Sequence, residues 1–145
     1  MKRIAKLAVF VLLGNMVSAG VYALLVGLLE AYRSRAGGSP ESYLGVAFAI
    51  LLPAALFPGG LLTGYLSRPH LKTWLGALGV SVGVYPAIFM IAVNLVMVYL
   101  VHDSDPLPFP ENVFLLGTFL SWALASWAGV RLGCSLRARK NSAQA

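Results

Sequence analysis

The chain has 145 residues, of which 59% are hydrophobic and 11% are charged, and its formal net charge is +6. A soluble domain of this size needs a far more charged surface, so the composition excludes an ordinary soluble fold. Four stretches contain no Asp, Glu, Lys or Arg; they run over 7–29, 42–67, 73–101 and 112–130. Because about 20 helical apolar residues cross a hydrocarbon core of about 30 Å, each stretch predicts a membrane-spanning helix.

The predicted fold is an all-α integral membrane protein with four transmembrane helices in an antiparallel bundle. In chain order, helices are expected over 7–29, 43–67, 73–101 and 112–135, followed by a polar tail over 136–145. The whole chain, 1–145, then forms a single transmembrane domain.

The N-terminus also has features of a cleavable signal peptide. Lys2 and Arg3 precede an apolar run, and small residues stand immediately before Gly20. The apolar run nevertheless continues to Leu29, which is longer than a usual signal core, so a retained first helix is expected.

Charges between the four stretches are distributed unevenly over the two sides of the predicted topology. One side carries nine basic and no acidic residues, namely Lys2, Arg3, Lys6, Arg68, Lys72, Arg131, Arg137, Arg139 and Lys140. The other side has Arg33 and Arg35 with Glu30, Glu41, Asp103, Asp105 and Glu111. Since loops rich in Lys and Arg stay cytoplasmic, a multi-pass protein of the plasma (inner) membrane with both termini cytoplasmic is predicted. The basic charge then reflects topology and attraction to the lipid bilayer, and no nucleic-acid partner is expected.

Three prolines interrupt the apolar stretches. Pro53 and Pro58 fall in the second predicted helix and Pro86 in the third, and each is a candidate kink because it removes a backbone N–H. Kinked helices form binding sites in some transporters, but prolines are also ordinary in membrane helices.

Two segments of the first and third predicted helices are similar to each other. Val17–Tyr22 and Val80–Tyr85 agree in five of six positions. Both helices would cross the membrane in the same direction, so the similarity is consistent with a parallel duplication of a helical hairpin. Chance matches are, however, common in apolar sequences.

Small residues recur every three or four positions on three of the predicted helices, which is the pattern of closely packed membrane helices. The candidates for helix packing are Gly60, Gly64, Gly76, Gly79, Gly83, Ser121, Ala125, Gly129 and Gly133. Most of these strips are expected to join the four helices to one another, which leaves one strip for a homo-oligomer or another membrane protein.

Few polar residues lie within the apolar stretches. The candidate polar intramembrane face comprises Asn15, Ser18, Tyr22, Ser81, Tyr85 and Asn94. An amide in hydrocarbon needs partners, so Asn15 and Asn94 are expected to point into the bundle, where they either join helices or line a small solute cavity.

The sequence offers little for catalysis. His102, Asp103, Asp105 and Glu111 could attract a divalent cation, but nothing imposes a ligand geometry, so no metal, no cofactor and no enzymatic activity are expected. The single cysteine, Cys134, cannot form an intrachain disulfide and is expected to pack as a small residue.

Two functions of different classes remain at this point. The leading expectation is a small plasma-membrane protein that binds a membrane partner, as an accessory subunit or an inhibitor or immunity-type protein. The alternative is a small-solute transporter or channel, oligomeric, built around the kinked second helix and the polar face. An ionisable group at mid-depth would favour the alternative, and the four stretches contain none.

Overall fold

The computed structural model describes residues 2–37, 40–67, 74–99 and 109–143, and each secondary-structure element in these ranges is a helix. In chain order the elements are α1 (Lys2–Ala36), α2 (Pro40–Val46), the π-helix η1 (Ala47–Leu51), α3 (Leu52–Ser67), α4 (Trp74–Val80), α5 (Val84–Tyr99) and α6 (Phe109–Ser142).

Three helical segments are long and apolar enough to cross a membrane: Ile4–Ala36, Tyr43–Ser67 and Phe114–Ser142. A shorter apolar segment, Val84–Val93, belongs to α5. The all-helical fold and these lengths are those of a multi-pass membrane protein.

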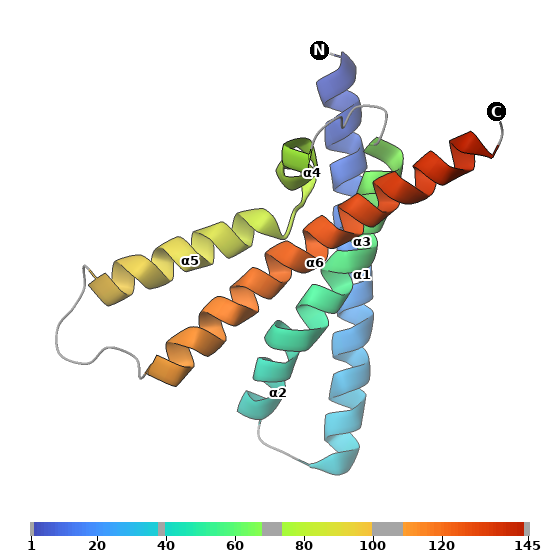
Figure 1. Cartoon of the computed structure of the whole chain (residues 1–145). Helices are drawn as coiled ribbons and strands as arrows, with labels where there is room; N and C mark the ends of the chain where they lie inside the picture. The colour runs from blue at the N-terminus through green and yellow to red at the C-terminus, as the bar shows by residue number, and fades with distance from the viewer. Residues whose placement is uncertain (1, 38–39, 68–73, 100–108, 144–145) are drawn as a thin grey trace.

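Helix α3 is the centre of the molecule, with α1 packed on one side and α6 on the other (Figure 1). Phe10 of α1 approaches Thr63, whereas Ser18 approaches Gly59, so α1 and α3 run antiparallel. Helices α3 and α6 run parallel, because Gly60 lies against Ser126 and Gly64, one turn later, lies against Val130. Helix α5 packs against α6 and diverges from α1 and α3 (Figure 1).

The second predicted helix is one continuous rod in which η1 joins α2 to α3. The backbone N–H of Leu52 bonds to the carbonyl of Ala47, five residues earlier, which is the π-helical pattern. In the same register the next donor would serve the Phe48 carbonyl, but that residue is Pro53, which has no N–H. The side chain of Trp122 supplies the missing donor, with Nε1 lying 2.9 Å from the Phe48 oxygen. Pro58 lies inside α3 without ending it.

The third predicted helix, 73–101, is not continuous in the structure. Helix α4 ends at Val80 and α5 begins at Val84, and the intervening turn is closed by a 3.0 Å bond from the Val84 N–H to the Ser81 carbonyl. Pro86 provides a physical reason, because an unbroken helix would leave the Val82 carbonyl without its donor. In the first turn of a new helix the missing N–H of Pro86 costs little. The similar segments at 17–22 and 80–85 therefore have different conformations, one inside α1 and the other across this break.

The last helix is longer than the sequence predicts. Helix α6 extends from Phe109 to Ser142, so the expected polar tail is helical over most of its length. Arg137 holds this extension against α3, where its Nη1 donates to the Tyr65 carbonyl at 3.0 Å and its guanidinium lies 5.4 Å from the Tyr65 ring centroid. Because Tyr65 is in the last turn of α3, the bond satisfies a carbonyl that the helix end leaves without a partner.

Candidate functional site

Two consecutive glycines give α3 two closely packed faces. Gly59 faces α1, and Gly60 faces α6; both are buried. A side chain on either residue would enter the backbone of the neighbouring helix, so glycine sets the distance between all three helices.

The contact between α1 and α3 is made of four small residues, Gly14, Ser18, Gly59 and Thr63, and all four are buried. A Cβ at Gly14 would lie 2.6 Å from the Gly59 carbonyl oxygen, closer than real side chains approach. Thr63 Oγ1 donates to the Gly59 carbonyl at 2.9 Å and reaches the Phe10 carbonyl of α1 at 3.5 Å. Backbone packing and a shared hydroxyl donor therefore hold this pair of helices together.

The contact between α3 and α6 is reciprocal. Gly60 and Gly64 of α3 lie against the backbone of Ser126 and Val130, and a Cβ at Gly60 would lie 2.5 Å from the Ser126 carbonyl oxygen. In return, Gly129 and Gly133 of α6 lie against the backbone of Phe57 and Leu61. These four glycines, all of them predicted packing residues, occupy one interface.

The other predicted packing residues have varied surroundings. Gly83 is buried beside Trp122, whose carbonyl oxygen would lie 2.5 Å from a Cβ, whereas Gly79 is exposed with open space around it. Ser121 donates to the Thr118 carbonyl at 2.6 Å, and Ala125 is half-buried. Gly76 lies in α4, and its surroundings fall outside the described residues.

The predicted polar face does not form one site. Ser18 and Ser81 are buried and Tyr22 is half-buried, but Tyr85 is exposed and donates its hydroxyl to the Gly79 carbonyl. Ser81 donates to the Ala77 carbonyl at 2.7 Å. Asn94 belongs to α5, and its side chain lies outside the described residues.

The expectation that Asn15 points into the bundle is wrong, because its side chain is exposed. One residue in an α-helix turns the side chain by about 100°, and Gly14 already occupies the face toward α3. The amide therefore lies beside the α1–α3 contact, on a face of α1 that points away from the described helices.

The middle of the bundle is closed. Gly14, Ser18, Gly60, Val80 and Ser126 surround a small internal space with no room for a water molecule. Ser126 Oγ accepts the N–H of Gly83 at 3.2 Å, which also satisfies a backbone donor at the break between α4 and α5. The buried hydroxyls thus serve helix packing and the backbone, and they line no pathway in this conformation.

Beside the exposed amide, α1 carries a ridge of small residues. Asn15, Ala19, Ala23 and Gly27 follow one another at every fourth position, and all four are exposed. A Cβ at Gly27 would meet no described heavy atom within 4 Å. This ridge, the Asn15 ridge, has the composition of a packing face but has no helix against it in the described chain.

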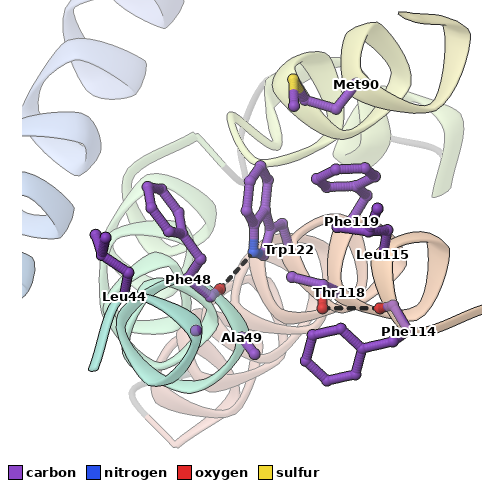
Figure 2. Close-up of a pocket in the computed structure, with 10 residues that line it drawn as sticks. Leu44, Phe48, Ala49, Met90, Phe114, Leu115, Thr118, Phe119 and Trp122 are labelled. Carbon is purple, nitrogen blue, oxygen red and sulfur yellow. Dashed lines mark hydrogen bonds between the residues drawn. The ribbon is translucent and has the colours of Figure 1, made fainter. Parts of the chain in front are cut away.

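A cavity lined by apolar side chains lies elsewhere, at the junction of α2, η1, α5 and α6. Its volume is about 310 Å³, and it is lined mainly by Leu44, Phe48, Met90, Phe114, Phe119 and Trp122. Figure 2 shows the indole of Trp122 between the rings of Phe48 and Phe119. The Phe119 and Trp122 rings meet edge to face with centroids 5.2 Å apart, and the Phe48 ring lies 6.4 Å from Trp122. We call this space the aromatic cavity.

Sequence reasoning missed the aromatic cavity and the packing residues of α1. Gly14 and Ser18 are small residues four positions apart, so the first helix carries the same spacing pattern that predicts packing faces on the other helices. The cavity had no comparable signal, because its residues come from three separate stretches of the chain.

Metal binding receives no support from the described parts of the chain, which contain no group of three His, Cys, Asp or Glu residues placed to hold an ion. His102, Asp103 and Asp105 lie outside the described residues, as does the side chain of Glu111. Cys134 packs against α3, with its Sγ 3.3 Å from the Gly64 carbonyl oxygen. Comparisons with protein-family models, with curated proteins and with solved structures find no match to this chain.

Proposed function

We propose that this chain is a small plasma-membrane protein that works by binding a membrane-protein partner, as an accessory subunit or an inhibitor or immunity-type protein. In this proposal α4 and α5 provide the fourth membrane crossing, and both termini are cytoplasmic. The nine basic residues on the side of the termini support that orientation.

The Asn15 ridge is the observation that carries the proposal. Asn15 stands near the middle of the charge-free stretch 7–29, so the hydrocarbon core surrounds it on any transmembrane placement of α1. An exposed amide has no hydrogen-bonding partner in lipid, and polar residues in such positions are costly. A second helix packed on the ridge would provide a partner for the amide and a close backbone contact along Ala19, Ala23 and Gly27.

The rest of the molecule supplies a rigid frame for such a face. The opposite side of α1 is fixed to α3 through Gly14 and Ser18, and α3 is fixed to α6 through the four glycines described above. A preorganised helix loses little conformational freedom when its partner binds, so the frame favours association.

The closed middle of the bundle argues against the alternative of a solute transporter or channel within one copy of the chain. Ser18 and Ser81 are buried, but the space near Ser18 admits no water, and Tyr85 is turned outward. A solute pathway would require polar groups that face a cavity, as binding sites in broken transporter helices do.

The proposal is tested by extraction of the tagged protein from its native membrane in mild detergent, with each ridge variant compared with a matched control. Asn15→Leu and Ala23→Leu alter the ridge. Val17→Leu adds bulk at an exposed position on another face of α1. A stoichiometric membrane protein, or a second copy of the chain, should co-purify with wild type and Val17→Leu and be lost from both ridge variants.

Equal thermal stability of the four purified proteins is the control for folding. Retention of the same partner by both ridge variants would contradict the proposal. A wild-type protein that is monomeric and without a stoichiometric partner in native membranes would contradict it as well.

A further inference from the structure

We propose that the aromatic cavity and the pocket beside it form a binding site for one membrane phospholipid of the outer leaflet. The cavity would take an acyl chain, and the neighbouring pocket would take the headgroup. This site lies on α2, η1, α5, α6 and the C-terminal end of α1, which faces outward in the orientation proposed above, and it shares no residue with the Asn15 ridge.

The chemistry of the lining selects hydrocarbon. Its two side chains with polar atoms, Trp122 and Thr118, both direct those atoms to backbone carbonyls, at Phe48 and Phe114 respectively, each at 2.9 Å (Figure 2). Neither side chain has an N–H or O–H donor left for a polar ligand. At about 310 Å³ the cavity lies at the small end of the range for ligand pockets, which suits a segment of a chain.

A second pocket of about 310 Å³ shares one lining residue, Leu44, with the cavity. Glu30, Arg33 and Tyr43 bring polar groups to this second pocket, beside the apolar Val26 and Leu29. Arg33 Nε donates to the Glu30 carboxylate at 2.8 Å, and the side chains of Arg33 and Glu30 are 31% and 59% exposed. One guanidinium and one carboxylate side by side complement the phosphate and the amine of a zwitterionic headgroup.

The charged groups of the second pocket and the aromatic groups of the cavity lie at different depths, as the two parts of a lipid do. Glu30 ends the charge-free stretch of α1, and Glu41 precedes that of α2, so this end of the molecule lies at the level of the headgroups. Phe48 lies seven residues beyond Glu41 along one helical rod, which is a depth of about 10 Å at a rise of about 1.5 Å per residue. The charged groups of the second pocket, Glu30 and Arg33, are therefore interfacial, whereas Phe48 of the aromatic cavity lies within the hydrocarbon layer.

Trp122 reports on occupancy of the cavity. It is only 6% exposed, so lipid that merely surrounds the protein has little access to its ring. Trp74→Phe combined with Trp127→Phe leaves it as the single tryptophan of the chain. This protein is reconstituted in phosphatidylcholine vesicles with or without bromine on the acyl chains, and quenching of its fluorescence is measured.

Gly45→Leu is the variant that should displace the chain. Gly45 lines the cavity, and a Cβ there meets no described heavy atom within 4 Å, so the larger side chain enters open space without a clash. Gly117→Leu is the matched control, because Gly117 has equal free space but does not line the cavity. Quenching should fall by about twofold in Gly45→Leu, where the new side chain takes the space of the acyl chain, and stay unchanged in Gly117→Leu.

Equal quenching in Gly45→Leu and wild type, or no quenching of Trp122 at all, would overturn the proposal. The headgroup is tested separately by native mass spectrometry of protein purified in mild detergent. One phospholipid should remain bound to wild type, and its retention should fall about twofold in Arg33→Gln, which keeps the polar side chain but loses the charge. Retention that does not depend on Arg33, or retention of free fatty acid alone, would overturn the assignment to a phospholipid.

Discussion

Helices α1, α3 and α6 meet through glycine, with backbone against backbone, whereas α5 meets α6 through large side chains. On the first side, Gly59 and Gly60 allow α3 to touch two neighbours at once. On the second side, Leu56, Ala87, Phe119 and Trp122 form a cluster of buried side chains from three helices. The first region has closed contacts and the second contains the aromatic cavity.

The difference shows how a small membrane protein can combine a closely packed region with a region that contains a cavity. Backbone contact through glycine leaves no free volume, and it is intolerant of any added atom. Large side chains at a wider separation leave gaps. Here Pro53 provides no N–H for the Phe48 carbonyl, and the side chain of Trp122, from another helix, donates to it instead. The following predictions, from the largest expected effect to the smallest, test this contrast.

Gly129→Leu should abolish folding of the bundle. Its side chain would enter the backbone of α3, because a Cβ at Gly129 would lie 2.9 Å from the Leu61 nitrogen. A backbone cannot move aside as a side chain can. Helical content, elution volume and thermal unfolding in detergent measure the effect. Gly117→Leu on the same helix is the control and should be stable, since its Cβ meets open space. Similar unfolding temperatures for the two variants would show that α3 and α6 are not in backbone contact.

Gly59→Ala should lower the free energy of unfolding by about 1–3 kcal/mol, the usual cost of adding a methyl group to a packed core. The new methyl group would press on Ser18 and on the backbone of Gly14. Gly27→Ala, on the exposed side of α1, should be neutral or slightly stabilising because alanine is the better helix former. Reversible unfolding in mixed detergent micelles gives both values, and a harmless Gly59→Ala would contradict the close α1–α3 contact.

Trp122→Phe should cost about 1 kcal/mol from the lost hydrogen bond, because a six-membered aromatic ring remains while the Phe48 carbonyl loses its donor. The loss should be smaller in a Pro53→Ala background, where the restored backbone N–H can donate to the freed carbonyls of η1. A double-mutant cycle on the free energy of unfolding measures this coupling. Additive effects of the two substitutions would show that Trp122 does not compensate for Pro53.

Asn15→Leu should leave the stability of the isolated monomer within about 0.5 kcal/mol of wild type, as for surface substitutions without a specific contact. The amide is exposed, so its removal breaks no packing within the chain. Thermal unfolding of the monomeric fraction in detergent provides the measurement. A large destabilisation would mean that Asn15 is bonded within the bundle after all, and that the ridge is not a free surface.

The membrane-spanning helices and the glycine interface could be predicted from the sequence, and the breaks and cavities could not. Charge-free stretches and small residues at every fourth position are local patterns, so the spans and Gly60, Gly64, Gly129 and Gly133 were open to prediction. Which of two adjacent faces of a helix packs inward depends on the neighbouring helix. For this reason the sequence alone predicts Asn15 and Ser18 on one buried face, whereas in the structure only Ser18 is buried.

The break in the helix after Val80 is hard to predict because residues that disfavour a helix stand within a long apolar stretch that favours one. Ser81 and Gly83 weaken a helix slightly and Pro86 weakens it more strongly, but the stretch 73–101 has the length and apolarity of a continuous span. The break is supported by contacts from elsewhere, since Ser126 of α6 accepts the Gly83 N–H. Such support from a distant part of the chain is visible only in the fold.

The most direct test of the central claim is a photo-crosslinking scan of α1 in the native membrane. A benzophenone side chain is placed at Ala19 or Ala23 on the Asn15 ridge, and at Leu13 or Leu24 on exposed positions of another face. A helix packed on the ridge predicts a discrete protein adduct from Ala19 and Ala23 and only lipid adducts from Leu13 and Leu24. Lipid adducts alone from all four positions would show that this face of α1 lies in the bilayer without a partner.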